Sequence, residues 1–90
     1  MKKTGIELIA IERKEQIEKH NYTAEHDENY YNEGQILEVV ETLISGVGGV
    51  PDNWNVKQFD YMKSKPKKER LIIAGALLAA EIDRLQALEK

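Results

Sequence analysis

Residues 66–88, PKKERLIIAGALLAAEIDRLQAL, decide the fold of this chain. In a helix built from this stretch, small residues lie between large apolar side chains. The large side chains fall on every side of the helix: Leu71, Ile72, Ile73, Leu77, Leu78, Ile82 and Leu85. A helix that is apolar all round is buried all round. Pro66 is well placed as its first residue, because proline fits the first turn of a helix. We therefore predict a long C-terminal helix at the centre of the molecule.

Three further stretches have helical patterns. Residues 4–20 begin with a capping box, Thr4-x-x-Glu7, and residues 32–45 carry a regular apolar stripe that ends at Gly46. A short helix over residues 55–62 begins at Asn55. These patterns predict an all-α fold, a single domain over residues 1–90 built as a bundle of three to four helices.

The segments between these helices are expected to be irregular. Residues 21–31, NYTAEHDENYY, are polar and aromatic without a clean period, so we predict a loop with at most one helical turn after Thr23. Residues 46–51 are rich in glycine and predict a flexible connection. Since no run alternates between apolar and polar residues, we expect no substantial sheet.

Composition excludes several classes of function. The 90 residues contain no cysteine, which excludes a disulfide framework and a thiol nucleophile, and two histidines are too few for a convincing transition-metal site. The net charge of -3 gives no general attraction to nucleic acid. The apolar run 71–80 is too short to span a bilayer. We expect a cytoplasmic protein with no cofactor, no bound metal, no membrane partner and no nucleic-acid partner.

The last helix also predicts self-association. A chain of 90 residues can hardly cover every face of a helix that is apolar all round, and the first helix has a second apolar edge at Leu8 and Ile11. Both observations favour a homodimer or a higher symmetric oligomer, with the first and last helices at the subunit interface. The alternative is a monomer that leaves a few apolar residues exposed.

Arg13 lies within the apolar stripe of the first helix. The residues that share this face of the helix are Ile6, Ile9, Ala10, Gln16, Ile17 and His20. Burying an unpaired guanidinium costs several kcal/mol. Arg13 is therefore expected to meet an internal carboxylate, a partner chain or an anionic ligand. Glu81 is the leading carboxylate, because it lies near the buried side of the last helix.

Four acids raise the question of an enzyme. Glu38 and Glu41 form an ExxE pair, and Glu81 and Asp83 lie on the last helix; all-α nucleotide pyrophosphohydrolases bind magnesium through such pairs. However, Glu38 and Glu41 flank their stripe, and the ExD spacing places Glu81 and Asp83 on different sides of the helix. Solvent-exposed helix faces explain these acids better than a metal site.

Aromatic and basic residues suggest a binding site instead. Stacking rings together with cationic side chains are suited to a phosphate-bearing base compound, and free N–H groups at the start of the last helix favour an anion. The candidate ligand-binding residues are Arg13, Gln16, Tyr22, His26, Trp54, Lys65 and Arg70. We expect their pocket between subunits, or between the C-terminal half of the first helix and the turn at residues 65–70. The structural alternatives are a Trp54 in the core, solvated lysines, and a local helix cap at His26-Asp27.

The chain resembles a family of small, largely uncharacterised phage and prophage proteins. The resemblance is carried by ERxxQ at residues 12–16, His26-Asp27, Lys65-Pro66 with Arg70, and AGALLAAEIDRL at residues 74–85, and it covers nearly the whole chain. The chain departs from the family pattern at residues 33–35, where the usual GEL is replaced by EGQ. It also lacks the tryptophan-rich stretch common before the KP pair.

The class of small helical phage proteins suggests a function. It includes anti-defence sponges, oligomers that sequester the cyclic nucleotide or cyclic ADP-ribose signals of bacterial immunity. The resemblance thus implies a non-enzymatic protein in the cytoplasm of an infected bacterium, with a nucleotide-derived ligand and copies of itself as partners. The alternatives are a magnesium-dependent nucleotide pyrophosphohydrolase, and an inhibitor that binds a host enzyme through acidic helix faces.

Overall fold

A computed structural model describes residues 2–20 and 22–89 of the chain. Over these residues it is all-helical, without strands, so the predicted fold class is confirmed. The helices are α1 (Gly5–His20), α2 (Ala24–Tyr30), α3 (Gln35–Ser45), α4 (Val56–Lys63) and α5 (Lys67–Leu88). The expected bundle of three to four helices thus has five, and the additional one is the short α2.

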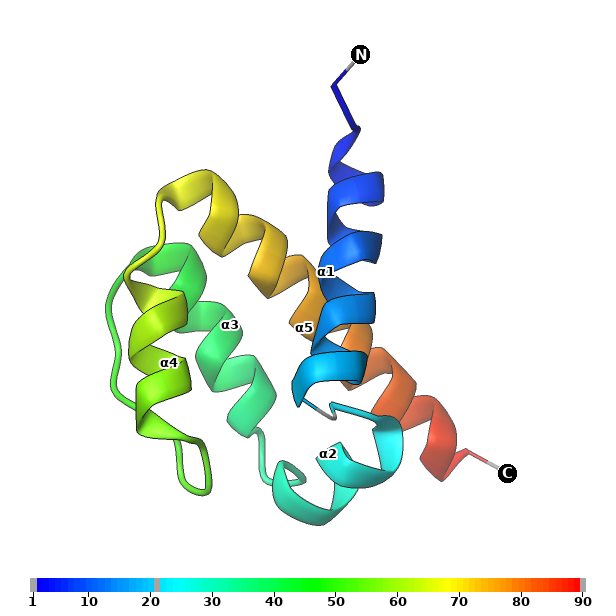
Figure 1. The fold of residues 1–90 in the computed structure, drawn as a ribbon. Helices are drawn as coiled ribbons and strands as arrows, with labels where there is room; N and C mark the ends of the chain where they lie inside the picture. The colour runs from blue at the N-terminus through cyan, green and yellow to red at the C-terminus, as the bar shows by residue number, and fades with distance from the viewer. Residues whose placement is uncertain (1, 21, 90) are drawn as a thin grey trace.

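Helix α5 is the centre of the fold, as the sequence predicts. It packs against α1, α2, α3 and α4, and Figure 1 shows it crossing behind α1 with α3 and α4 to one side. The main apolar core lies between α3 and α5 and is closed by aromatic side chains from the connections: Tyr22, Tyr31, Ile36, Val39, Val40, Leu43, Trp54, Phe59, Met62, Ile73, Ala74 and Leu77. Burial of these side chains is the main source of stability.

Glycine sets the distance between α1 and α5. A Cβ atom at Gly75 would lie 2.6 Å from Cδ1 of Ile9, so only glycine leaves room for this isoleucine without a shift. The two helices can therefore approach closely where they cross. This contact joins the N-terminal half of α1 to the N-terminal half of α5.

The helix ends follow the predicted capping residues. Thr4 and Glu7 exchange two hydrogen bonds, since the Thr4 N–H donates to Glu7 and the Glu7 N–H donates to the Thr4 hydroxyl. Asn55 accepts from the N–H of Gln58 and begins α4. Helix α3 ends at Gly46, whose φ of 83° lies in the left-handed region that glycine adopts most easily.

The prediction of a loop over residues 21–31 is wrong for most of that segment. Residues 24–30 form α2, and Thr23 caps it by accepting a hydrogen bond from the N–H of His26. One helical turn was expected there, and the helix continues because it packs against α5. Helix α3 correspondingly begins at Gln35 rather than near Asn32, since Gly34 has a φ of 89° and interrupts the helix. Asn21 lies outside the described residues.

The orientation of α1 also differs from its predicted stripe. Ile9 and Gln16 face α5, but Ile6 is 82% exposed and Ala10 and Ile17 are exposed as well. The inward face is therefore rotated toward the polar residues of the stripe. The close contact at Gly75 fixes this rotation, because it centres the interface on Ile9.

Helix α5 is not covered on every side by its own chain. Its core face is buried, whereas a stripe on the opposite face is exposed: Leu71, Leu78, Ile82, Leu85 and Leu88. The sequence leads to the expectation that one chain cannot cover this helix, and the structure leaves this stripe open. Among the described residues, no helix is long and apolar enough to cross a membrane.

Candidate functional site

Arg13 is held by groups of its own chain. Its guanidinium donates one hydrogen bond of 2.7 Å to the carbonyl oxygen of Tyr22 and a second of 2.9 Å to Oδ2 of Asp83. The side chain is 12% exposed, in agreement with the expectation of a largely buried arginine. The carboxylate is Asp83, however, and the choice of Glu81 as the leading candidate is wrong.

Glu81 has a different partner, Arg84, one turn further along α5. The guanidinium of Arg84 donates to both carboxylate oxygens of Glu81 at 2.8 and 3.0 Å, and to Glu28 of α2 at 2.8 Å. These hydrogen bonds raise the pKa of Arg84 above its ordinary value. The pair is almost completely buried, and it ties α2 to the C-terminal half of α5. The sequence analysis missed Arg84, although its i+3 spacing from Glu81 predicts this pair.

Asp27 is a second charged group whose burial the sequence analysis did not predict. It is 1% exposed, and its Oδ1 lies 3.2 Å from Nδ1 of His26. Its other oxygen, Oδ2, has no hydrogen-bond partner among the described residues. Burial raises the pKa of Asp27, while His26 and Arg13 act in the opposite direction. A buried carboxylate with one free oxygen is therefore part of the α1–α2–α5 contact.

Aromatic rings gather next to this buried polar region. Trp54 stacks on Tyr31 with 4.2 Å between ring centroids, and Tyr22 meets the edge of Trp54 at 5.7 Å. His26 lies parallel to Tyr22 at 5.8 Å. Burial raises the pKa of both tyrosines. The structure thus brings together three of the predicted binding residues, Tyr22, His26 and Trp54, with Tyr31 as an unpredicted fourth ring.

A pocket opens at the surface of this cluster. We call it the aromatic pocket; its volume is about 380 Å³, and it is lined by His20, Tyr22, His26, Tyr31, Asn55, Lys57 and Gln58. Its lining therefore combines aromatic rings, two amides and a lysine. Gln16 lies below the surface at 2% exposure, and its amide atoms have no hydrogen-bond partner in the described part of the chain. The pocket has the size of a small-molecule site.

The remaining predicted cations lie elsewhere. Arg70 donates to the carbonyl oxygen of Leu43 at 3.1 Å and caps the end of α3. Lys65 lies over the ring of Tyr61, with its Nζ 4.3 Å from the ring centroid. The hydrogen bond to Tyr61 raises the pKa of this lysine. Arg13, Lys65 and Arg70 therefore do not converge on a common phosphate site.

A pocket of about 340 Å³ does lie between α1 and the turn before α5, where the sequence analysis places the ligand. Lys65 lines it, but neither Arg13 nor Arg70 does. Three carboxylates line it as well, Glu12, Glu15 and Glu69. Burial raises the pKa of Glu12, with repulsion from Glu15 as a second cause. These acids repel an anion, so the pocket does not suit a phosphate.

The four acids of the enzyme alternative are also separate. Glu81 binds Arg84 and Asp83 binds Arg13, so two of the four carboxylates are neutralised by arginine. Glu38 and Glu41 are exposed on α3 and line a different pocket. Within residues 2–20 and 22–89, no three His, Cys, Asp or Glu side chains are grouped so that they could hold a metal ion.

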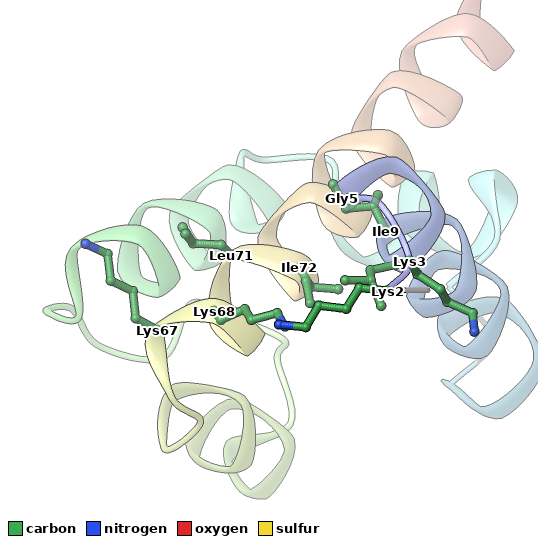
Figure 2. Close-up of a pocket in the computed structure, with 9 residues that line it drawn as sticks. Lys2, Lys3, Gly5, Ile9, Lys67, Lys68, Leu71 and Ile72 are labelled. Carbon is green, nitrogen blue, oxygen red and sulfur yellow. The ribbon is translucent and has the colours of Figure 1, made fainter.

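A further hollow lies between the beginnings of α1 and α5, and we call it the lysine groove. Its volume is about 710 Å³. Leu8, Ile9, Leu71 and Ile72 supply its apolar floor, and Lys2, Lys3, Lys67 and Lys68 supply its rim. Figure 2 shows these lysines on two segments, the start of α5 and the stretch before α1; the side chain of Lys68 extends toward the second segment, whereas that of Lys67 extends away from it. An apolar floor with a cationic rim suits an amphipathic, acidic partner.

Comparisons with models of protein families, with curated proteins and with solved structures found no match to this chain.

Proposed function

We propose that this chain is a binding protein that holds a nucleotide-derived signal in the aromatic pocket without converting it. The observation that carries the proposal is the composition of the pocket wall. His26, Tyr22 and Tyr31 line the pocket, with His26 the most exposed of the three rings, and Asn55 and Gln58 offer amide groups. Stacking on rings and hydrogen bonding to amides are how proteins hold a nucleobase.

Lys57 supports an anionic ligand in the same pocket. It is exposed at the start of α4 and lines the pocket together with the rings. A cyclic nucleotide or cyclic ADP-ribose compound would place its base on the rings and a phosphate near this ammonium group. Among the cationic candidates, Arg13 and Arg70 donate to groups of their own chain, so we assign the phosphate contact to Lys57. The biological setting that we propose is the phage counter-defence implied by the resemblance of the sequence.

The absence of conversion is supported by the residues around the pocket. Thr23 is engaged in capping α2, and His26 lies against the buried Asp27. A hydrolase would need a nucleophile or a metal beside such a pair. The acids that could serve a metal lie elsewhere and, in the case of Glu81 and Asp83, are bound to arginines.

The proposal is tested by titrating the chain with cyclic mononucleotides, cyclic dinucleotides and cyclic ADP-ribose in the presence of magnesium. Trp54, the only tryptophan, stacks on a ring of the pocket, so its fluorescence should change when a ligand binds. Tight binding, with intact ligand released on heating, is the expected result. Conversion of the nucleotide would instead support the enzyme alternative, and no binding of any compound would refute the proposal.

Two lysine variants locate the site. Lys57→Ala should weaken binding about tenfold, because a charge-assisted hydrogen bond contributes about 1.5–3 kcal/mol. Lys14→Ala is the matched control, since Lys14 is exposed on α1 and pairs only loosely with Glu18 at 3.9 Å. Equal affinity in both variants would place the ligand outside the aromatic pocket.

A further inference from the structure

The lysine groove brings cationic side chains together without a carboxylate among them. Its lining contains four lysines and no Asp or Glu: Lys2, Lys3, Lys67 and Lys68. Within residues 2–20 and 22–89, none of these lysines belongs to an ion pair. Like charges that share a groove repel one another, so they favour an anion that binds between them.

Two acids that are close in sequence do not line the groove. Glu7 belongs to the capping box of α1, where its carboxylate accepts a hydrogen bond of 2.8 Å from the N–H of Thr4. Glu69 follows Lys68 in α5, but it lines the other pocket, the one that contains Lys65. The lining of the groove is therefore positive, although the whole chain has a net charge of -3.

Two helices begin at this groove. Helix α1 begins at Gly5, which lines the groove, and α5 begins at Lys67 after Pro66, which provides no side-chain cap. The N-terminus of a helix carries a partial positive charge and attracts anions. Lysines at this end of a helix are unfavourable for the helix by itself. An anion in the groove would offset this repulsion at both helices.

The floor of the groove selects the rest of the ligand. Leu8 and Ile9 of α1 and Leu71 and Ile72 of α5 form it, and Leu71 is 43% exposed. The volume of about 710 Å³ lies in the range of small-molecule sites. A helix is about 10–12 Å across, so two turns of a partner helix would need roughly 1,000 Å³. The groove therefore suits an alkyl chain better than a helix, and a hollow fits one molecule better than the flat surface of a bilayer.

We propose that the lysine groove binds a single-chain anionic amphiphile, with a linear alkyl chain on the floor and a carboxylate or phosphate head group among the lysines. The side chain of Lys68 extends toward the segment that carries Lys2 and Lys3, so cations of both segments surround the head group (Figure 2). Lysine stems cover apolar surface while their ammonium groups stay in water, which suits the boundary between chain and head group. The groove shares no lining residue with the aromatic pocket, and the inference does not depend on the nucleotide ligand.

Titration calorimetry with three soluble probes tests the chemistry of the ligand. The probes are decanoate, hexanoate and decyltrimethylammonium, each below the concentration at which it forms micelles. Decanoate should bind, and hexanoate should bind much more weakly, because each buried methylene strengthens binding about fourfold. Decyltrimethylammonium has the longer chain with a cationic head group and should not bind. Equal binding of decanoate and either other probe would overturn the proposal, as would no binding of decanoate.

Two leucine variants test whether the chain lies on the floor of the groove. Leu71→Ser should weaken decanoate binding about tenfold, because it removes apolar surface from the floor. Leu78→Ser is the matched control, since Leu78 is 40% exposed on the same helix and does not line the groove. It should leave the affinity unchanged. Equal affinities of the two variants would place decanoate outside the groove and overturn the proposal.

Two double lysine variants test the head-group contact. Lys2→Ala with Lys68→Ala should weaken decanoate binding about tenfold, as the product of two exposed charge contacts. Lys14→Ala with Lys57→Ala removes the same charge outside the groove and should leave decanoate binding unchanged. Equal losses would mean that net charge alone attracts the ligand, which contradicts the proposal. Association with phosphatidylglycerol vesicles without affinity for decanoate would assign the groove to a bilayer surface and also contradict it.

Discussion

The two sides of α5 are held by different chemistry. Toward α3 the contact is apolar, with Leu77 meeting a layer of Ile36 and Leu43 that is almost completely buried. Toward α1 and α2 the contact contains buried arginines, acids and amides, and several of their atoms lack partners among the described residues: Arg13 Nε, the Gln16 amide and Asp27 Oδ2. The apolar side contributes most of the stability. The polar side contributes less, because buried polar atoms without partners lower the free energy of unfolding.

Loss of Arg84 should have the largest effect on stability. Arg84→Met leaves Glu81 buried without its partner and releases Glu28 of α2. Removing one member of a buried ion pair costs about 3–5 kcal/mol. We expect the free energy of unfolding, measured with urea, to fall by about 4 kcal/mol.

The double variant Glu81→Leu with Arg84→Met distinguishes the cost of an unpaired buried charge from the cost of altered packing. It removes both members of the pair and replaces them with apolar side chains of similar size, which is often close to neutral. It should therefore recover most of the lost stability. A double variant as unstable as Arg84→Met would mean that the hydrogen bond to Glu28 carries the effect.

The apolar side should be nearly as sensitive. Leu77→Ala creates a cavity at a side chain that is 1% exposed, and such substitutions cost about 2–5 kcal/mol. We expect a loss of about 3 kcal/mol in urea unfolding. Leu78→Ala is the matched control, because Leu78 is 40% exposed and its truncation should cost less than about 1 kcal/mol. Equal losses would contradict the assignment of the two faces.

The apolar side is also the part of the fold that the sequence predicts well. Regular spacing of large apolar residues gives α3 and α5, and the capping residues Thr4, Asn55 and Gly46 mark three helix ends within one or two residues. Helix α2 is missed because its sequence is polar and short. It is stabilised by contacts with α5, such as the Glu28–Arg84 pair, and a local pattern contains no information about them.

The site was predicted less completely for the same reason. Sequence spacing predicts that Arg13 needs a carboxylate, a partner chain or an anionic ligand, but the choice of Asp83 over Glu81 depends on how α1 crosses α5. Tyr22 precedes α2, His26 lies in α2 and Trp54 precedes α4, so their rings meet only when these segments fold together. Lys57 gives no sequence signal of its own, since one lysine on a short helix is ordinary.

Arg13 should matter less to stability than Arg84, although both are buried. Its acid, Asp83, is 48% exposed, so water can solvate the carboxylate when the arginine is removed. Arg13→Met loses mainly the hydrogen bond to the carbonyl of Tyr22, which we expect to cost about 1–2 kcal/mol in urea unfolding. A loss of 4 kcal/mol or more would show that the Arg13–Asp83 pair is as essential as the Glu81–Arg84 pair.

The smallest expected effect is a gain in the free energy of unfolding, and it concerns Asp27. Because burial raises its pKa in the folded state, its ionised form is less favourable there than in the unfolded chain. Between the ordinary pKa of 3.8 and the raised value, the folded state binds more protons, so stability falls as pH rises through this window. Asp27→Asn removes this titration and keeps an oxygen to face His26.

Urea unfolding of both proteins between pH 3.5 and pH 7 measures this difference. Asp27→Asn should match the unmodified chain at the acid end and become progressively more stable than it as pH rises, with a constant difference above the raised pKa. Other acids with shifted pKa values, such as Glu12 and Glu7, are common to both proteins and cancel in the comparison. An advantage of the unmodified chain that grows with pH would instead show that attraction to Arg13 outweighs the burial of the charge, and that the polar side of α5 stabilises the fold by charge.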